Sequence, residues 1–459
     1  MYDRLKSCDT FAFVVAGSGV VFGKNADRPS DEAHEVVHTP ATTHADGATV
    51  RCTHITIPQV KKTFATVLSK PSWMWGCEIG ANSEGVVGGN EAVSSLLSHE
   101  LGDEPRLLGM DLLRLALERG GTARDAVDVL CALLETHGQG GPCEDGGDWT
   151  YENGFMIADS CEAFVVETAG VRHWAVECVR PGTGRNISNG LSIRMPDWCA
   201  SGVQDVCRAK GWWDGEGDFD WKLCVGHGGG LRAHSKLELY GRERAGKRHI
   251  DAAASRLSAG TLAPDDVSGW LRWMIGVLRD DTSGICFRDT HGFMSTGSQV
   301  SWLPLAERSV ASHLFTAASD PLVTCYKRFA FARRDECTPP PPSNPDPPAE
   351  AHMKDHTHPN PHRSEGSPTP PSSLQLWRRW RGIDLRGGLA RVTNSDAVAT
   401  RMRETMQKLE EAAIAQAVAA AVNGTTTSTS DANGTDSFAA SLAAELALLE
   451  SLESEADGR

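Results

Sequence analysis

The sequence lacks three features, and each absence removes a class of protein. Its longest apolar stretches, 11–15 and 412–422, are shorter than the ~20 apolar residues that a membrane span needs. It has no GxGxxG motif and no regular alternation of strands and helices, which disfavours a dinucleotide-binding Rossmann fold. None of its 13 cysteines forms a CxxC pair, which excludes a zinc ribbon or a thioredoxin motif.

Positive charge is also scarce. Lysine and arginine number 45 against 60 aspartates and glutamates, so the formal net charge is −15. Nucleic acid binds concentrated basic surfaces, and the basic aromatic run at 377–381 (WRRWR) is short, so we expect no nucleic-acid partner. The first residues, MYDRLKSCDTFAF, lack the apolar core of a secretory signal. We therefore expect a cytoplasmic protein without a membrane span, whose thiols are reduced.

Composition divides the chain into four segments. Residues 338–373 hold 12 of the 23 prolines and four histidines, which predicts an extended, disordered linker. A compact body precedes it at 8–337, after a candidate leader peptide at 1–7. The C-terminal extension, 374–459, is helical and partly low-complexity, with helical spacing at 402–413 and 438–452. These helices either pack on the body or dock a protein partner.

Within the body, short strand-like runs and amphipathic helices predict an α+β fold. Residues 10–15 and 20–23 flank a glycine-rich turn, which is typical of a β-hairpin. Further strands are predicted at 55–57, 64–68, 85–88, 154–158 and 163–167. Helices are predicted at 107–120, 122–137 and 263–278.

Cys8 has the position most suggestive of chemistry, because it directly precedes the first predicted strand. Removal of residues 1–7 would place its thiol beside its own α-amine. The pKa values of an α-amine and a thiol, ~7.7 and ~8.5, are matched for proton transfer at neutral pH. An N-terminal nucleophile could then work without a separate histidine base. The alternative is a small buried residue before a strand.

A polar segment, FGKNADRP at 22–29, follows the predicted hairpin. A hairpin returns the chain to the start of its first strand, so Lys24 or Asp27 is predicted to lie near Cys8. A carboxylate there could hold the new amine, and a cation could lower the pKa of the thiol. The alternative is a solvated polar turn.

Several motifs, in this order, resemble the secernin family of the dipeptidase branch of N-terminal nucleophile hydrolases. They are SCDTF, FGKNADRPSDE, WMWGCEIGANSEGVVGGNEAV, LLGMDLLRLALER and RNISNGLSI. The resemblance covers about residues 8–314, with a weaker match at 402–411. It implies a four-layer αββα sandwich, a small peptide or amide substrate, and no metal or other cofactor.

The resemblance also implies site residues. Cys8 matches the nucleophile, and Asp27 matches the acid that holds the freed amine. Lys24 stands where related amidases carry arginine, which keeps a cation but loses the planar fork. Asn90 matches an asparagine that binds the oxyanion, and Asn189 matches a second active-site asparagine.

Arg242 is a looser match to an active-site arginine. It lies in a basic run of this chain, GRERAGKR, which would otherwise be a solvated face. Glu78 and Glu91 flank the Asn90 segment and could bind a substrate amine. Two functional interpretations remain open, because the fold does not determine the activity. One is a cysteine hydrolase of dipeptides or small amides. The other is a catalytically silent regulator of secretion (exocytosis) on the same scaffold.

Overall fold

The computed structural model places the body and both C-terminal helices. The predicted leader, the proline-rich linker with its histidines and the basic aromatic run lie outside the described residues. The residues that the structure describes are 8–102, 104–227, 241–288, 292–305, 309–331, 376, 396–423 and 435–457.

The predicted N-terminal hairpin is present. Strands β1(Asp9–Val15) and β2(Gly19–Pro29) pair antiparallel from Val15 opposite Gly19 to Asp9 opposite Asn25. The turn needs glycine at Gly19, whose φ of +143° disfavours side chains. An added Cβ there would also lie 2.2 Å from the carbonyl oxygen of Leu303.

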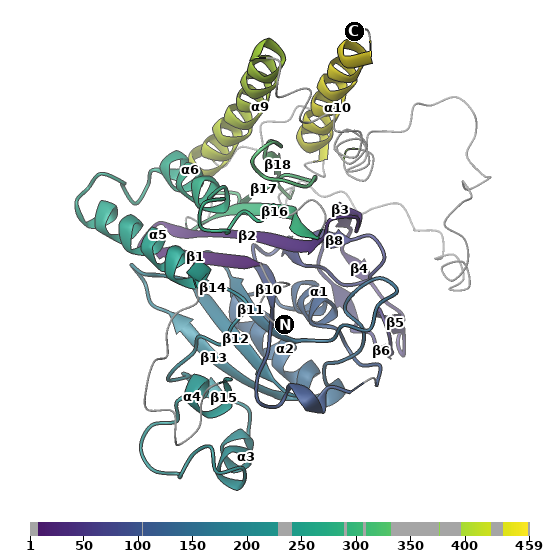
Figure 1. Ribbon diagram of the computed structural model, residues 1–459, viewed down its shortest axis with the longest axis vertical. Helices are drawn as coiled ribbons and strands as arrows, with labels where there is room; N and C mark the ends of the chain where they lie inside the picture. Colours follow the sequence, from purple (N-terminus) through teal and green to yellow (C-terminus); the bar gives the residue numbers. More distant parts are fainter. Residues whose placement is uncertain are drawn as a thin grey trace, which may run out of the picture.

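Two large antiparallel sheets form the centre of the molecule (Figure 1). Sheet A has the strand order β14-β1-β2-β16-β17-β18, and sheet B has the order β15-β13-β12-β11-β10-β9-β8-β3. The remaining strands of sheet A are β14(Gly184–Ile187), β16(Phe293–Pro304), β17(Ser312–Phe315) and β18(Lys327–Phe329). Those of sheet B are β3(His34–Thr39), β8(Thr66–Pro71), β9(Ile79–Asn82), β10(Val87–Val93), β11(Glu152–Ala158), β12(Ala163–Ala169), β13(His173–Val179) and β15(Trp198–Cys199). Two small ribbons pair β4(Thr42–Thr43) with β7(Lys62–Thr63) and β5(Thr49–Arg51) with β6(Thr56–Pro58).

Helices cover the outer face of each sheet, so the body is a four-layer αββα sandwich and the predicted fold class is confirmed (Figure 1). On sheet B lie α1(Gly109–Arg119) and α2(Ala123–His137); on sheet A lie α5(Gly241–Ser258) and α6(Val267–Leu278). The shorter helices are η1(Ser98–Glu100), α3(Val203–Ala209) and α4(Trp221–Val225).

Side-chain caps set the helix starts. The Thr122 side chain accepts the Asp125 N–H at the start of α2, as the sequence predicts. Helix α6 begins four residues later than predicted. The Asp266 side chain caps it by accepting the N–H of Gly269, and residues 263–266 form the turn before it.

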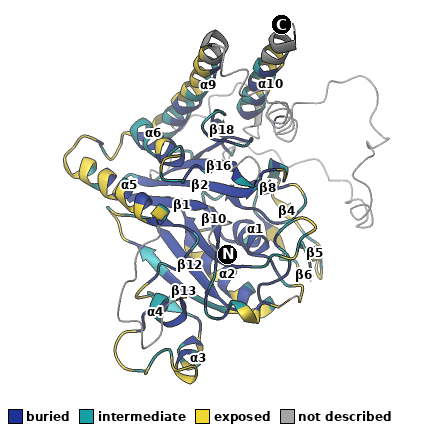
Figure 2. Ribbon diagram, in the orientation of Figure 1, coloured by how far each residue is buried: buried dark blue, intermediate teal, exposed yellow. Residues whose placement is uncertain are grey.

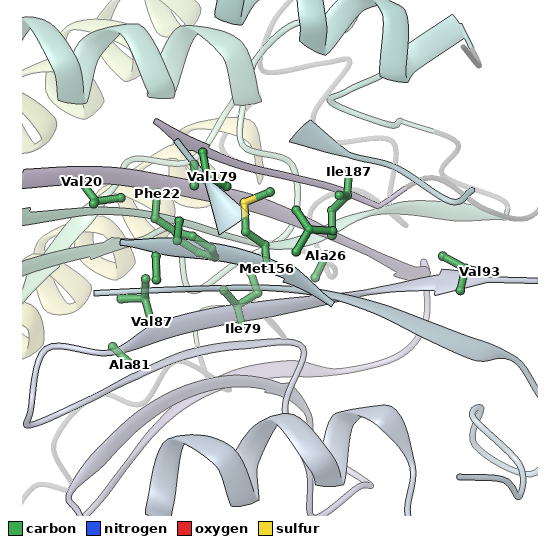
Figure 3. Close-up of a cluster of buried hydrophobic side chains, with 14 of the residues drawn as sticks. Val20, Phe22, Ala26, Ile79, Ala81, Val87, Val93, Met156, Val179 and Ile187 are labelled. Atoms are coloured by element: carbon green, nitrogen blue, oxygen red, sulfur yellow. The ribbon is translucent and has the colours of Figure 1, made fainter. Parts of the chain in front are cut away.

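The main core lies between the two sheets, where inward-facing side chains of both interdigitate (Figure 3). Phe22 and Ala26 from sheet A meet Ile79, Val87 and Met156 from sheet B. The central strands of both sheets are almost entirely buried, whereas β3, β13, β14 and β15 are partly exposed (Figure 2). Strand β1 is apolar on both faces: Ala12 and Val14 belong to the core between the sheets, and Phe11 and Phe13 belong to the core under the helices of sheet A. Pairing the sheets removes both inner faces from water.

The C-terminal helices α9(Asp396–Asn423) and α10(Thr435–Asp457) pack on the edge of sheet A around β18 (Figure 1). Helix α10 contributes Phe438, Leu442 and Leu449 to the core, and its Glu445 forms a fully buried ion pair with Lys327 of β18. Both helices match their predicted positions. Their role in binding a protein partner stays a prediction. No helix within the described ranges is long and apolar enough to cross a membrane.

Candidate active site

Cys8 lies directly before β1, with 7% of its surface exposed. Its Sγ accepts the backbone N–H of Asp27 at 3.1 Å and lies 3.6 Å from the carbonyl oxygen of the same residue. The hairpin creates this contact, because the pairing of β1 with β2 carries the chain back past its own start. The prediction that the polar segment returns to Cys8 is confirmed.

The surroundings of Cys8 keep its thiol protonated. Burial raises the pKa of this thiol well above its usual range. The positive charge of Lys24 acts in the opposite direction, while the nearby acids Glu91, Glu78 and Asp27 raise the pKa further. The thiol therefore needs a base before it can act as a nucleophile.

Lys24 is fully buried on the same face of the hairpin, since it pairs with Thr10, two residues beyond Cys8. Its Nζ donates to the carbonyl oxygen of Glu78 at 3.0 Å and to Glu78 Oε2 at 3.1 Å. Burial lowers the pKa of Lys24, but Glu78, Cys8 and Glu91 together more than offset this, so the pKa is raised and the lysine is charged. Lys24 is thus committed to a carboxylate of the protein.

Asn90 lies on β10 beside this ion pair. Its Oδ1 is 3.4 Å from Lys24 Nζ, and its Nδ2 donates to Asn153 Oδ1 at 3.1 Å. With the amide turned over, its nitrogen instead lies 2.9 Å from Glu78 Oε2. In either orientation the Asn90 amide is held by groups around Lys24.

Arg242, near the start of α5, binds the backbone of Cys8. Its Nη1 donates to the carbonyl oxygen of Cys8 at 3.0 Å and to Asp9 Oδ2 at 2.5 Å, and its Nη2 donates to Asn189 Oδ1 at 2.7 Å. Asn189 Nδ2 in turn donates to the carbonyl oxygen of Ala92 at 2.9 Å. The structure thus joins Asn189 and Arg242, and Arg242 is not part of a solvated face.

Asp9 supports Arg242 although sequence reasoning did not single it out. The Asp9 carboxyl is fully buried and also accepts a hydrogen bond from the Ser188 hydroxyl. Burial raises the pKa of Asp9 to about 6, against the opposing effect of Arg242. The position of Asp9, directly after the candidate nucleophile, was the signal that could have identified it. Its partner Arg242 is 233 residues away in the sequence.

The Asp27 side chain has a partner that the sequence does not indicate. Ser295 Oγ donates to Asp27 Oδ1 at 2.6 Å from β16, the strand next to β2. A register irregularity between Ser295 and Gly297 lies at this point of the strand pair. Such bulges re-aim side chains and occur next to active sites.

Glu91 and Glu78 both lie in this cluster. The Glu91 carboxyl accepts from the Thr10 hydroxyl, and burial raises the pKa of Glu91 well above its usual range. Glu78 contacts Lys24 on one side and Arg28 Nη1, at 3.4 Å, on the other. Glu78 therefore binds cations of the protein itself, and its predicted role toward a substrate amine is not what these contacts favour.

No family model matches the chain. Among solved structures, penicillin V acylase from Agrobacterium tumefaciens is 13% identical, over 70% of this chain and 86% of the acylase, with a TM-score of 0.40. A mutant of the conjugated bile acid hydrolase from Clostridium perfringens is 12% identical, over 67% of this chain and 88% of the hydrolase, with a TM-score of 0.37. A Caenorhabditis elegans N-acylethanolamine-hydrolyzing acid amidase ortholog is 13% identical, over 40% of this chain and 70% of the amidase, with a TM-score of 0.26.

These likenesses are too weak to carry an inference about chemistry, so function depends on the geometry around Cys8. Membership of the secernin family stays a prediction.

Proposed function

We propose that the protein is a cysteine-type N-terminal nucleophile hydrolase that cleaves small amides, with dipeptides as the expected substrates. One observation carries this proposal: groups from three separate parts of the chain, at 24–27, 189 and 242, come together around Cys8. The backbone N–H of Asp27 binds the thiol, and Lys24 places a cation near it. Arg242 binds the Cys8 carbonyl oxygen and is itself held by Asn189.

The first step needs a free α-amine on Cys8. After loss of residues 1–7, the amine takes the thiol proton and becomes an ammonium, and the thiolate remains. Asp27 is the acid assigned to hold this ammonium. Burial disfavours the thiolate, and Lys24 offsets part of that cost through its charge. Arg242 keeps the Cys8 backbone in place during the proton transfer.

The thiolate then attacks the carbonyl carbon of the substrate amide. Asn90 and backbone N–H groups are the proposed donors to the oxyanion, a type of interaction worth about 3 kcal/mol for each donor. The leaving amine takes the proton from the ammonium as the carbon–nitrogen bond breaks, which leaves a thioester on Cys8. Water then hydrolyses the thioester and regenerates the thiol.

The alternative is a catalytically silent regulator of secretion on the same scaffold. The deep burial of the Cys8 thiol among acids favours it, because a thiol whose pKa stays high is a poor nucleophile. The two proposals differ in whether residue 8 becomes the N-terminus. A cytoplasmic location and a partner at the C-terminal helices remain predictions under both.

The test is the intact mass and N-terminal sequence of the purified protein, followed by a dipeptide screen. A chain that starts at Cys8 and releases amino acids, with all activity lost in Cys8→Ala, supports the hydrolase. A chain that keeps Met1 or Tyr2 and hydrolyses no dipeptide supports the regulator. Activity that persists in Cys8→Ala would exclude Cys8 as the nucleophile.

A further inference from the structure

We propose that Glu78 is a positioning residue for Cys8: it holds the Lys24 ammonium in sheet B and limits how much of that charge reaches the thiol. The inference extends the proposed function, because it concerns how the thiol of that site becomes reactive. In this inference Lys24 interacts with charges of the protein itself and does not bind a substrate carboxylate.

The path of the Lys24 side chain is built into sheet B. An added Cβ at Gly89 would lie 2.5 Å from Lys24 Cδ, so the lysine stem crosses β10 only because residue 89 is glycine. The stem ends with Nζ against two oxygens of Glu78. The lysine side chain thus runs from sheet A to the Glu78 carboxylate, directly before β9 in sheet B.

The ion pair belongs to a balanced row of four buried charges. Lys24 and Arg28 carry the positive charges, and Glu78 and Glu32 carry the negative ones. Arg28 contacts both oxygens of Glu32 and is within 3.4 Å of Glu78. Arg28 therefore keeps a bidentate partner if Glu78 loses its charge, and the Glu78→Gln variant leaves no cation of the row without a hydrogen-bond acceptor.

The charged groups that shift the pKa of the Cys8 thiol come from β2, β10 and the residue before β9. Lys24 and Asp27 lie on β2, Glu78 directly precedes β9, and Glu91 lies on β10. Lys24 is the cation among them, and its effect on the thiol opposes that of the three acids. Loss of the Glu78 charge would leave Lys24 facing the thiol with one fewer competing anion, which favours the thiolate.

The experiment measures alkylation of Cys8 by iodoacetamide between pH 6 and pH 10 in the full-length protein. Trypsin cuts after Lys6 and Lys24, so the Cys8 peptide contains no second cysteine. If Lys24 is replaced, the peptide extends to Arg51, because Pro29 blocks cleavage after Arg28, and it still contains one cysteine. Wild type is compared with Glu78→Gln, Lys24→Met and the matched control Glu32→Gln, which removes a negative charge from the far end of the row.

We expect Glu78→Gln to speed alkylation at a given pH by about tenfold, equivalent to about one pKa unit, and Lys24→Met to slow it. Glu32→Gln should change it less than Glu78→Gln does. A general loosening of the fold would speed alkylation in all three variants, so opposite signs distinguish the proposal from structural damage.

Equal or slower alkylation in Glu78→Gln, or faster alkylation in Lys24→Met, would overturn the proposal. So would an effect of Glu32→Gln as large as that of Glu78→Gln. The assay reads the thiol and not hydrolysis, so this inference and the proposed function can fail independently.

Discussion

Replacement of Glu445 on α10 tests whether the C-terminal extension is part of the folded body. Glu445 and Lys327 are both fully buried, and Lys327 Nζ also donates to the carbonyl oxygens of Thr316, at 2.6 Å, and Cys325, at 2.8 Å. The Cys325 thiol lies 3.3 Å from Glu445 Oε2. Substitution with glutamine keeps the size of the side chain but removes its charge. The Lys327 ammonium then stays buried with only neutral acceptors among these groups.

Removal of one partner from a buried ion pair typically costs 3–5 kcal/mol, because the remaining charge is desolvated without compensation. The two carbonyl oxygens reduce that cost, so we expect Glu445→Gln to lower the free energy of unfolding by about 3 kcal/mol. The paired variant Glu445→Leu/Lys327→Met removes both charges and should recover most of this loss.

The measurement is urea unfolding followed by tryptophan fluorescence and circular dichroism, with Glu411→Gln as the control. Glu411 pairs with Arg272 at a half-exposed position, and exposed pairs contribute about 0–1 kcal/mol. Wild-type stability in Glu445→Gln, or equal losses in the single and double variants, would refute the reasoning. That result would mean that α10 does not pack against β18 as described.

Three further variants probe the site itself. Cys8→Ala should abolish amide hydrolysis but change stability by no more than about 1–2 kcal/mol, as measured by urea unfolding, because its bonds to Asp27 are weak thiol contacts. Gly89→Ala should displace the Lys24 side chain and slow Cys8 alkylation; an unchanged rate would show that the stem does not need the glycine. Asp9 has a folded-state pKa of about 6, above the ordinary 3.8 of the unfolded chain, so its protonation favours folding at low pH and that contribution is lost as pH rises from about 4 through 6. Wild type should therefore lose about 3 kcal/mol relative to Asp9→Asn over that interval, and parallel stability curves would contradict the assignment.

The contact between Cys8 and Asp27 could be predicted from the local sequence. Adjacent strands joined by a short glycine turn have one reasonable register, so the hairpin brought Asp27 to Cys8 without knowledge of the rest of the fold. Helices α1, α2, α9 and α10 were likewise predictable, since apolar residues recur at helical spacing within each segment.

The partners of the site residues were not predictable in the same way. Ser295 reaches Asp27 across 268 residues, and Arg242 reaches Asp9 across 233. Serine and arginine in such segments have no local pattern that marks them. Only strand pairing between β2 and β16, and the packing of α5 on β1, bring them to Cys8.

Lys24 shows most clearly what the sequence determines and what the tertiary structure determines. Its place on the hairpin, near Cys8, follows from the sequence alone, because backbone pairing is local there. Its partner was decided when the two sheets packed face to face. That packing placed the aliphatic part of the Lys24 side chain over Gly89 and its ammonium against Glu78. Because the pair is buried between the sheets, its two charges interact far more strongly than they would in water.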